Sequence, residues 1–407
     1  MRARRFALQL STLLVLLPAA CAGDGRGGDD AGQGATTDAS GSTSGDASGS
    51  TGDTAPTTTA EPTSGTGTSG PDPTDTSPGT STSTTGDGTG GTTGGVGPTP
   101  GALCDPVPVC DAAPPTIPGQ GPEESELSRG HDMFYVDGED QWVIAKFTKW
   151  GFPLDKDIEG SAVHLFLDRG CAGEWTELGV AITTAEGEHP TVQGVDDSGG
   201  RVYFKIPQNK LLGPGRHRVH MIVEEYWNTA DAIIDVVPQG APFFVSDVDG
   251  TLTTSENAEA WDFLLGTMPD ANPFAAEALQ ILADKGYRAF YITARPEWLD
   301  RRTREFVDLR GFPAGLVHTT LTYTGGTGDT AAAYKTEEFA LLKAKGLVPA
   351  FLFGNKDSDA KAFDTTMIPT DHRFFFQFTD AVFGGTRIDS YEELLAPFEA
   401  LPDLCNP

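Results

Sequence analysis

The chain has 407 residues, and its 28 Lys and Arg against 58 Asp and Glu give a formal net charge of −30. This length allows two or three folded domains. So acidic a chain lacks the clustered Lys and Arg that neutralise nucleic-acid phosphates, which excludes nucleic acid as a partner. The same charge opposes direct adsorption on an anionic lipid surface. The 50 Gly and 29 Pro indicate that part of the chain does not fold.

Residues 1–21 have the organisation of a secretory signal. Three Arg among the first five residues precede a mostly apolar stretch, 6–17, which is too short to span a membrane, and Pro-Ala-Ala-Cys21 follows. A cysteine directly after small residues resembles the lipobox of bacterial lipoproteins, which implies cleavage before Cys21 and lipidation of Cys21. An ordinary signal peptide with an incidental cysteine is the alternative. We expect a cell-envelope protein, lipid-anchored at the outer membrane or cell surface.

Residues 22–102 consist almost entirely of Gly, Ser, Thr, Ala, Asp and Pro, and they contain no Leu, Ile, Phe, Trp or Tyr. Such a segment buries too little apolar area to offset the entropy lost when the backbone is ordered. We predict a disordered tether between the anchor and the folded part, with an r.m.s. span on the order of 50 Å.

Four further cysteines fit an exported protein: Cys104, Cys110, Cys171 and Cys405. They allow three pairings, and the sequence does not choose among them. Cys104 and Cys110 could close a short loop, and Cys405 could tie the C-terminus to Cys171 or to Cys104. A zinc site is the alternative, but its usual ligand spacing is missing and the His residues are scattered. We therefore expect disulfides.

Residues 103–240 contain short runs rich in β-branched and aromatic residues, separated by Gly, Pro, Asp and Asn. This spacing predicts an immunoglobulin-like β-sandwich. His217 and His220 are three residues apart on one expected strand and so point to opposite faces. We expect them at the surface or rim rather than in a metal site, and we find no catalytic pattern in this half. The expected strands are 141–150, 162–167, 175–182, 201–206, 216–223 and 232–237.

Residues 241–407 alternate between expected strands and helices, which predicts an α/β fold with a Rossmann-like parallel sheet covered by helices. In such sheets the functional groups gather beyond the carboxyl ends of the strands. The expected strands are 242–246, 288–292 and 350–353, and the expected helices are 262–265, 275–285, 298–309 and 337–345.

The first expected strand of this half is followed directly by Asp247 and Asp249, and Gly-Thr251 completes the turn. Two carboxylates there can bind a hard cation, and one can act as nucleophile while the other donates a proton. A calcium-binding loop is the alternative, but it would need Gly where Leu252 stands. This pattern of two carboxylates beside a glycine turn is specific.

Weaker signals follow at the ends of later elements. Thr293 and Arg295 end the second strand, where a hydroxyl and a backbone N–H suit a phosphate oxygen. Lys335 opens the helix expected at 337–345. Asn355 and Asp359 lie in an acid-rich turn after the third strand, which can complete a cation site.

Taken in order, these clusters resemble the motifs of the haloacid dehalogenase superfamily of phosphohydrolases, and more closely those of lipin-type phosphatidate phosphatases. The resemblance covers residues 242–400 and rests on Asp-Val-Asp-Gly-Thr at 247–251, Thr-Ala-Arg at 293–295 and Gly-Asn-Lys-Asp-Ser-Asp at 354–359. In that family an immunoglobulin-like domain adjoins the catalytic one. Glu256 replaces an Asp of the lipin pattern, and the lipin regulatory and basic regions are missing.

The resemblance implies a phosphomonoesterase that depends on Mg²⁺. Asp247 would be the nucleophile that forms an aspartyl-phosphate, and Asp249 would donate a proton and then activate water. The implied substrate-binding residues are Thr251, Thr293, Arg295 and Lys335. The implied metal-binding residues are Asp247, Asp249, Asn355 and Asp359.

The intervals between the motifs leave no room for a full cap domain, so we expect an open mouth. A phosphatidate-like lipid or another phosphoester could then reach the site, and Trp298 and Leu299 lie near the mouth in this interpretation. A non-catalytic lipid- or phosphate-binding surface module of the same fold is the alternative function. A structural surface protein with a relic site is the third.

Overall fold

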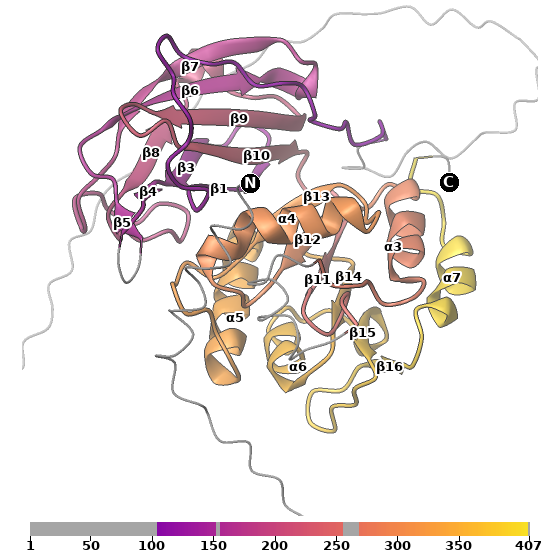
Figure 1. The fold of residues 1–407 in the computed structure, drawn as a ribbon. Coiled ribbons are helices and arrows are strands. Elements are labelled where there is room, and N and C mark those ends of the chain that lie inside the picture. Colours follow the sequence, from indigo (N-terminus) through magenta and orange to yellow (C-terminus); the bar gives the residue numbers. More distant parts are fainter. Residues whose placement is uncertain (1–103, 152–154, 255–267, 406–407) are drawn as a thin grey trace, which may run out of the picture. The chain divides into compact units, whose positions relative to one another are not determined.

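A computed structural model describes residues 104–151, 155–254 and 268–405 (Figure 1). All of these residues fall within one compact unit of the chain. The predictions for the signal with Cys21, for the tether and for a helix at 262–265 lie outside them. Within the described ranges, no helix combines the length and the apolar character that crossing a membrane requires.

The N-terminal half of the described chain is built from β-strands. They are β1 (Arg129–His131), β2 (Met133–Val136), β3 (Trp142–Lys146), β4 (Thr148–Lys149), β5 (Lys156–Asp157), β6 (Ala162–Asp168), β7 (Trp175–Ile182), β8 (Arg201–Lys205), β9 (Gly215–Val223) and β10 (Thr229–Val237). One sheet has the order β2-β10-β9-β6-β7, in which β2 runs parallel to β10 and the other neighbours are antiparallel. A second, antiparallel sheet has the order β1-β3-β8.

These two sheets share one hydrophobic core. Side chains alternate along a strand, so Val163, Leu165 and Leu167 of β6 all point inward. They pack in the same cluster as Val143 and Ile144 of β3 in the other sheet. All six strands predicted in this half are present, and β7 has the predicted bounds. The immunoglobulin-like assignment of this half stays a prediction.

The expectation that His217 and His220 lie at the surface or rim is wrong, since each is only 4% exposed. β9 is the central strand of its sheet; one of its faces packs in the core through Val219 and Met221, and the segment around Cys110 lies at Arg218 on the other. The Gly170 N–H donates to His217 Nδ1 at 3.1 Å, and the neighbouring Arg218 donates to the carbonyl of Cys110 at 3.0 Å. A strand with both faces covered buries its polar residues as well, provided that they are hydrogen-bonded.

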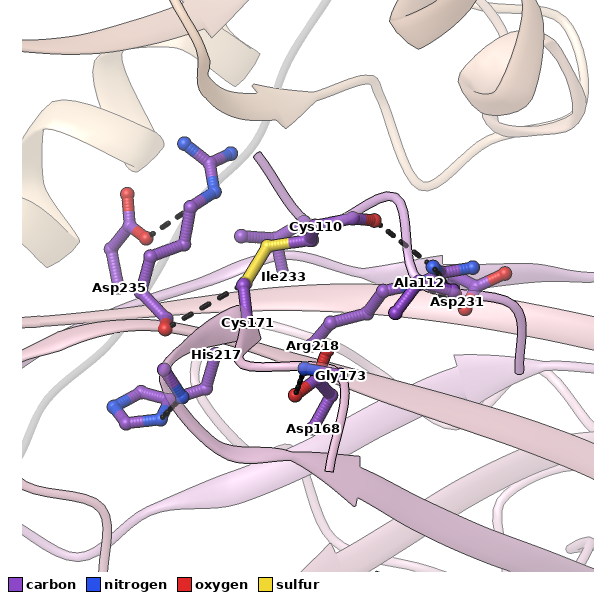
Figure 2. The surroundings of a disulfide bond; sticks show 12 residues. Cys110, Ala112, Asp168, Cys171, Gly173, His217, Arg218, Asp231, Ile233 and Asp235 are labelled. Carbon is purple, nitrogen blue, oxygen red and sulfur yellow. Dashed lines mark hydrogen bonds and ion pairs between the residues drawn. A yellow bond between two sulfur atoms is a disulfide. The ribbon is translucent and has the colours of Figure 1, made fainter. Parts of the chain in front are cut away.

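Two disulfides resolve the pairing that the sequence leaves open. Cys104 pairs with Cys405, and Cys110 pairs with Cys171 (Figure 2), so the short loop between Cys104 and Cys110 is not closed. The second bond ties the segment around Cys110 to the end of β6, close to Arg218 of β9. The first bond joins positions 301 residues apart and so ties the two ends of the described chain together.

The C-terminal half contains a six-stranded parallel sheet with the order β13-β12-β11-β14-β15-β16. Its elements in chain order are β11 (Phe243–Ser246), α3 (Ala275–Asp284), β12 (Arg288–Ile292), the 3₁₀ turn η4 (Glu297–Leu299), α4 (Asp300–Leu309), β13 (Gly315–His318), α5 (Asp329–Ala344), β14 (Phe351–Gly354), α6 (Asp357–Asp364), β15 (Arg373–Phe376), β16 (Thr386–Ile388) and α7 (Glu392–Glu399) (Figure 1).

Helices cover both faces of this sheet, as the sequence predicts for an α/β fold. Phe244 of β11 packs in a core with side chains of α3, α4 and α7. Its neighbours Phe243 and Val245 point to the other face and pack with side chains of α5 and α6. A strand buried on both faces is continuously apolar, which explains the run Phe-Phe-Val before the carboxylates.

One helix boundary differs from the prediction in a way that affects the site. α5 begins at Asp329, well before the predicted start at 337, because the run of Ala after Gly328 and Asp329 continues the helix toward its N-terminus. Lys335 therefore lies inside a 16-residue helix rather than at its opening. Its side chain projects from a rigid element.

Candidate active site

The carboxyl ends of three adjacent strands bring the predicted site residues together. β11 pairs with β12 on one side and with β14 on the other. Asp247 continues β11, and its N–H donates to the Phe353 carbonyl of β14 at 2.9 Å. Thr293 continues β12, and Asn355 follows β14. Parallel strands end at one edge of a sheet, so residues far apart in the chain share one site.

Asp247 is buried and hydrogen-bonded on both carboxylate oxygens. Lys335 Nζ donates to Oδ1 at 2.5 Å, and Thr251 Oγ1 donates to Oδ2 at 2.9 Å. Lys335 Nζ also donates to Asp359 Oδ1 at 2.5 Å, and only 1% of the Lys335 side chain is exposed. The Lys335 ammonium therefore bridges the carboxylates of Asp247 and Asp359 and fixes the orientation of the Asp247 carboxylate.

Burial and charge shift the proton affinities of this pair. Burial raises the pKa of Asp247 to about 6; Lys335 opposes that rise, and the carboxylates of Asp359 and Asp249 add to it. Burial disfavours the charge of Lys335, but the two carboxylates outweigh burial and hold its pKa above the ordinary value. Lys335 therefore remains a cation at neutral pH.

Asp249 is the more accessible carboxylate, with 24% of its side chain exposed. Thr293 Oγ1 donates to its Oδ2 at 2.7 Å. Arg295 donates to its Oδ1 from Nε at 2.8 Å and from Nη2 at 2.6 Å. Thr303 in turn accepts a bond from Arg295 Nη1 at 3.1 Å. Thr293 and Arg295, predicted to bind substrate, thus hold Asp249, just as Thr251 holds Asp247.

A cavity of about 280 Å³ opens beside these carboxylates. Its walls include a turn, 326–328, before α5, and two residues that the sequence analysis did not single out, Lys356 and Ser358. Ser358 is buried, and its Oγ has no hydrogen-bond partner among the described residues. A buried hydroxyl of this kind suits a ligand oxygen. Both residues belong to the Gly-Asn-Lys-Asp-Ser-Asp motif, which contained the signal for finding them.

A second cavity, of about 650 Å³, lies along α3 and is lined by residues such as Asn272, Gln280 and Arg310. None of the predicted site residues lines it. The smaller cavity, which contacts Asp247, Asp249 and Lys335, is therefore the candidate active site.

The oxygen atoms of this site fit a magnesium ion. The candidate donors are the Asp247 carboxylate, the Asp249 carbonyl and the Asn355 side chain, and Mg²⁺ prefers oxygen ligands. Asp359 accepts bonds from the Asn355 N–H at 2.9 Å and from Lys335, so it supports the turn that holds Asn355. Within the described ranges, no group of three or more His, Cys, Asp and Glu is arranged to hold a metal. An ion here would complete its shell with water, as Mg²⁺ commonly does.

Comparison with known proteins gives a family model and several relatives that match part of the chain. Residues 244–377 match the family model described as PITM 1-3, LNS2 domain. Human membrane-associated phosphatidylinositol transfer protein 3 is 26% identical over 191 residues, which cover 46% of this chain and 18% of the relative. The protein retinal degeneration B of Drosophila melanogaster is 29% identical over 192 residues, covering 46% of this chain and 14% of the relative. The chain thus spans less than a fifth of either relative.

Among solved structures, a class C acid phosphatase from Bacillus anthracis with tungstate bound is similar to 29% of this chain. The match covers 53% of that phosphatase at 18% identity, and its TM-score of 0.23 is too low to support an argument. The family match is more informative, because its range runs from within β11 to the end of β15 and contains every predicted site residue from Asp247 to Asp359. The match thus supports an LNS2 domain at residues 244–377, a type of domain that is haloacid dehalogenase-like and related to the lipin phosphatases.

Proposed function

We propose that this chain is a Mg²⁺-dependent phosphomonoesterase in which Asp247 forms an aspartyl-phosphate. The environment of Asp247 carries the proposal. The carboxylate lies at the end of a buried strand, beside a cavity, with Lys335 Nζ at 2.5 Å and the Thr251 hydroxyl at 2.9 Å. A fixed carboxylate next to a permanent cation suits attack on a phosphate ester, whose own negative charge the cation offsets.

The reaction needs two displacements at phosphorus. In the first, an oxygen of Asp247 bonds to phosphorus, the bond to the leaving oxygen breaks, and Asp249 gives that oxygen a proton. In the second, water gives a proton to Asp249 and attacks the same phosphorus, which releases phosphate and restores the Asp247 carboxylate. When bound at Asp247, Asp249 and Asn355, Mg²⁺ would supply positive charge to the phosphoryl oxygens.

A lipid phosphate such as phosphatidate is the first substrate to test. One relative is named a membrane-associated phosphatidylinositol transfer protein, and a phosphorylated lipid is therefore the natural first candidate. The cavity of about 280 Å³ is large enough for a phosphate head group and too small for a whole lipid. Leu299 and Pro296 give it an apolar wall, and the Trp298 indole donates to the Tyr323 carbonyl at 2.9 Å.

Phosphate-ester binding without turnover is the second candidate, and one observation favours it. Arg295 donates to both oxygens of Asp249, at 2.6 to 3.0 Å. Bidentate pairing with a guanidinium favours the ionised carboxylate over the protonated acid that the first displacement requires. A domain in which Asp249 stays ionised would hold a phosphate ester without cleaving it.

The experiment measures phosphate release from phosphatidate and from a panel of soluble phosphomonoesters, with Mg²⁺ or with a chelator. The wild type should release phosphate only with Mg²⁺, and Asp247→Asn should release none. Asp329→Asn is the matched control, because Asp329 is an exposed carboxylate whose side chain is 91% accessible. Phosphate release by the Asp247→Asn variant would contradict the mechanism. Saturable binding with no release in the wild type favours the second candidate.

The remaining organisation is part of the same proposal. Cys21 carries a lipid anchor in the cell envelope, 22–102 is a tether, 103–240 is an immunoglobulin-like domain and 241–407 is the catalytic domain. The support is the order of the sequence segments. Cys21→Ser should move the protein from the membrane fraction to the soluble fraction, and unchanged fractionation contradicts the anchor.

A further inference from the structure

We infer that Glu297 is a positioning residue through which the β-rich half holds the acid–base carboxylate Asp249. Glu297 does not contact Asp249; it acts through Arg295, two residues earlier. This inference rests on the proposed function, and it gives the β-rich half a role that its sequence did not suggest.

Glu297 is the centre of a buried ion triad. Arg129 Nη2 of β1 lies 2.8 Å from Glu297 Oε2, and Arg201 Nη1 of β8 lies 2.9 Å from Glu297 Oε1. Arg201 Nη2 adds a bond of 3.2 Å to Oε2. Only 1% of the Arg201 side chain and 9% of the Glu297 side chain are exposed. Burial disfavours the charge of Glu297, but the two arginines hold its pKa below the ordinary value.

The sheet β1-β3-β8 carries the cations that pair with Glu297. Arg129 pairs with Lys146 across β1 and β3, and Lys146 pairs with Arg201 across β3 and β8, so three cations form one row. Like charges in register on one face of a sheet destabilise it. Asp157 lies 2.9 Å from Lys146, and Glu297 pairs with both arginines at the ends of the row, which reduces their mutual repulsion. The row thus fixes where Glu297 must lie.

The link from Glu297 to Arg295 is short and stiff. Pro296 stands between them with φ −56° and ψ 147°, and its ring prevents rotation about φ. The Glu297 N–H donates to the Thr322 carbonyl at 3.0 Å, and the Arg295 carbonyl accepts the Thr320 hydroxyl at 2.8 Å. A displacement of Glu297 would therefore move the Arg295 guanidinium and with it the Asp249 carboxylate.

The test compares Glu297→Gln with Asp132→Asn. Asp132 is a fully buried carboxylate of the β-rich half that pairs with Arg304 of α4. Its oxygens also accept bonds from the N–H groups of Ile233 and Val317, which lie outside residues 293–299. Both variants remove one charge from a buried ion pair between the same halves. Glu297→Gln should lower kcat roughly 100-fold with a small change in KM, because misplacing a reacting group by about 1 Å has an effect of that size. Asp132→Asn should lower the thermal midpoint and leave kcat within about twofold.

A double-mutant cycle separates positioning from general destabilisation. If Glu297 acts through Arg295, Arg295→Lys combined with Glu297→Gln should be no slower than Arg295→Lys alone. Arg201→Lys keeps the charge but loses the bidentate geometry, so it should give an intermediate kcat and serves if Glu297→Gln does not fold. Additive losses in the cycle, or equal kcat losses in Glu297→Gln and Asp132→Asn, would overturn the inference.

The same variants keep the two proposals distinguishable. If the wild type shows no turnover on any phosphomonoester, the proposed function fails, and the dissociation constant of inorganic phosphate becomes the readout. Glu297→Gln and Arg295→Lys should then weaken phosphate binding by the same factor, and the double variant should weaken it no further. Phosphate binding of Glu297→Gln equal to that of the wild type would overturn the inference in that case.

Discussion

Replacing Lys335 with Met removes the cation that holds the centre of the site together. The Lys335 ammonium donates to Asp247 and to Asp359 at 2.5 Å each, and all three side chains are at most 3% exposed. Without it, two buried carboxylates face each other with no counter-charge at this point. Breaking a buried ion pair by removing one partner costs about 3–5 kcal/mol, so we expect a loss of at least that order in the free energy of unfolding.

Urea unfolding of the disulfide-intact protein, followed by tryptophan fluorescence, measures this loss. Lys335→Met should lower the midpoint clearly, and Lys335→Met combined with Asp359→Asn should recover part of it, since one carboxylate becomes a neutral amide. Lys361→Met is the control, because the Lys361–Asp329 pair is exposed on both sides and should contribute almost nothing. Equal midpoints for Lys335→Met and Lys361→Met would refute the reasoning.

Three further predictions concern residues around the site and the chain ends. Burial disfavours a charged imidazole, but Glu338 outweighs burial and raises the pKa of His318. The contribution of this pair to the stability of the fold is therefore complete below the unfolded pKa of about 6.5, and it is lost as pH rises through the folded pKa. Urea midpoints from pH 6 to 8 should therefore fall less steeply in His318→Gln; an unchanged slope contradicts this. Cys405→Ser should lower the free energy of unfolding by about 2–5 kcal/mol, because it removes the disulfide to Cys104. Peptide mapping of the wild type without reductant should find the Cys104–Cys405 bond, and its absence would contradict the pairing. Thr251→Val removes the hydroxyl that bonds the nucleophile and should cost about 1.5–3 kcal/mol in urea unfolding, whereas wild-type stability contradicts a bond to a buried carboxylate.

Local patterns in the sequence predict most of the strands. β7 and β12 have the predicted bounds, because each is rich in β-branched or aromatic residues and is bounded by polar or glycine-containing segments. β15 and β16 were not predicted. They are short runs, of four and three residues, and they become strands by pairing with the strand that precedes each of them in the chain. Runs this short, below the usual strand length of about five to six residues, leave little local pattern.

The motifs place the site but not the bonds within it. The sequence brings Thr293 and Arg295 to the site, because both follow a parallel strand, but it assigns them to the substrate. In the structure they donate to Asp249, on the neighbouring strand, at distances that depend on register and side-chain rotamers. The contacts of Glu297 to Arg129 and Arg201 join residues 168 and 96 positions apart, so no local pattern could have revealed them.

The central claim is that the carboxylate of Asp247 takes up the phosphoryl group of the substrate. Rapid acid quenching during turnover of a phosphomonoester with Mg²⁺, followed by peptide mass spectrometry, tests it directly. The account predicts one phosphoryl group on the peptide that contains Asp247, absent in Asp247→Asn and absent without substrate. Turnover with no phosphoryl group on that peptide, or with the group on another residue, would contradict the account.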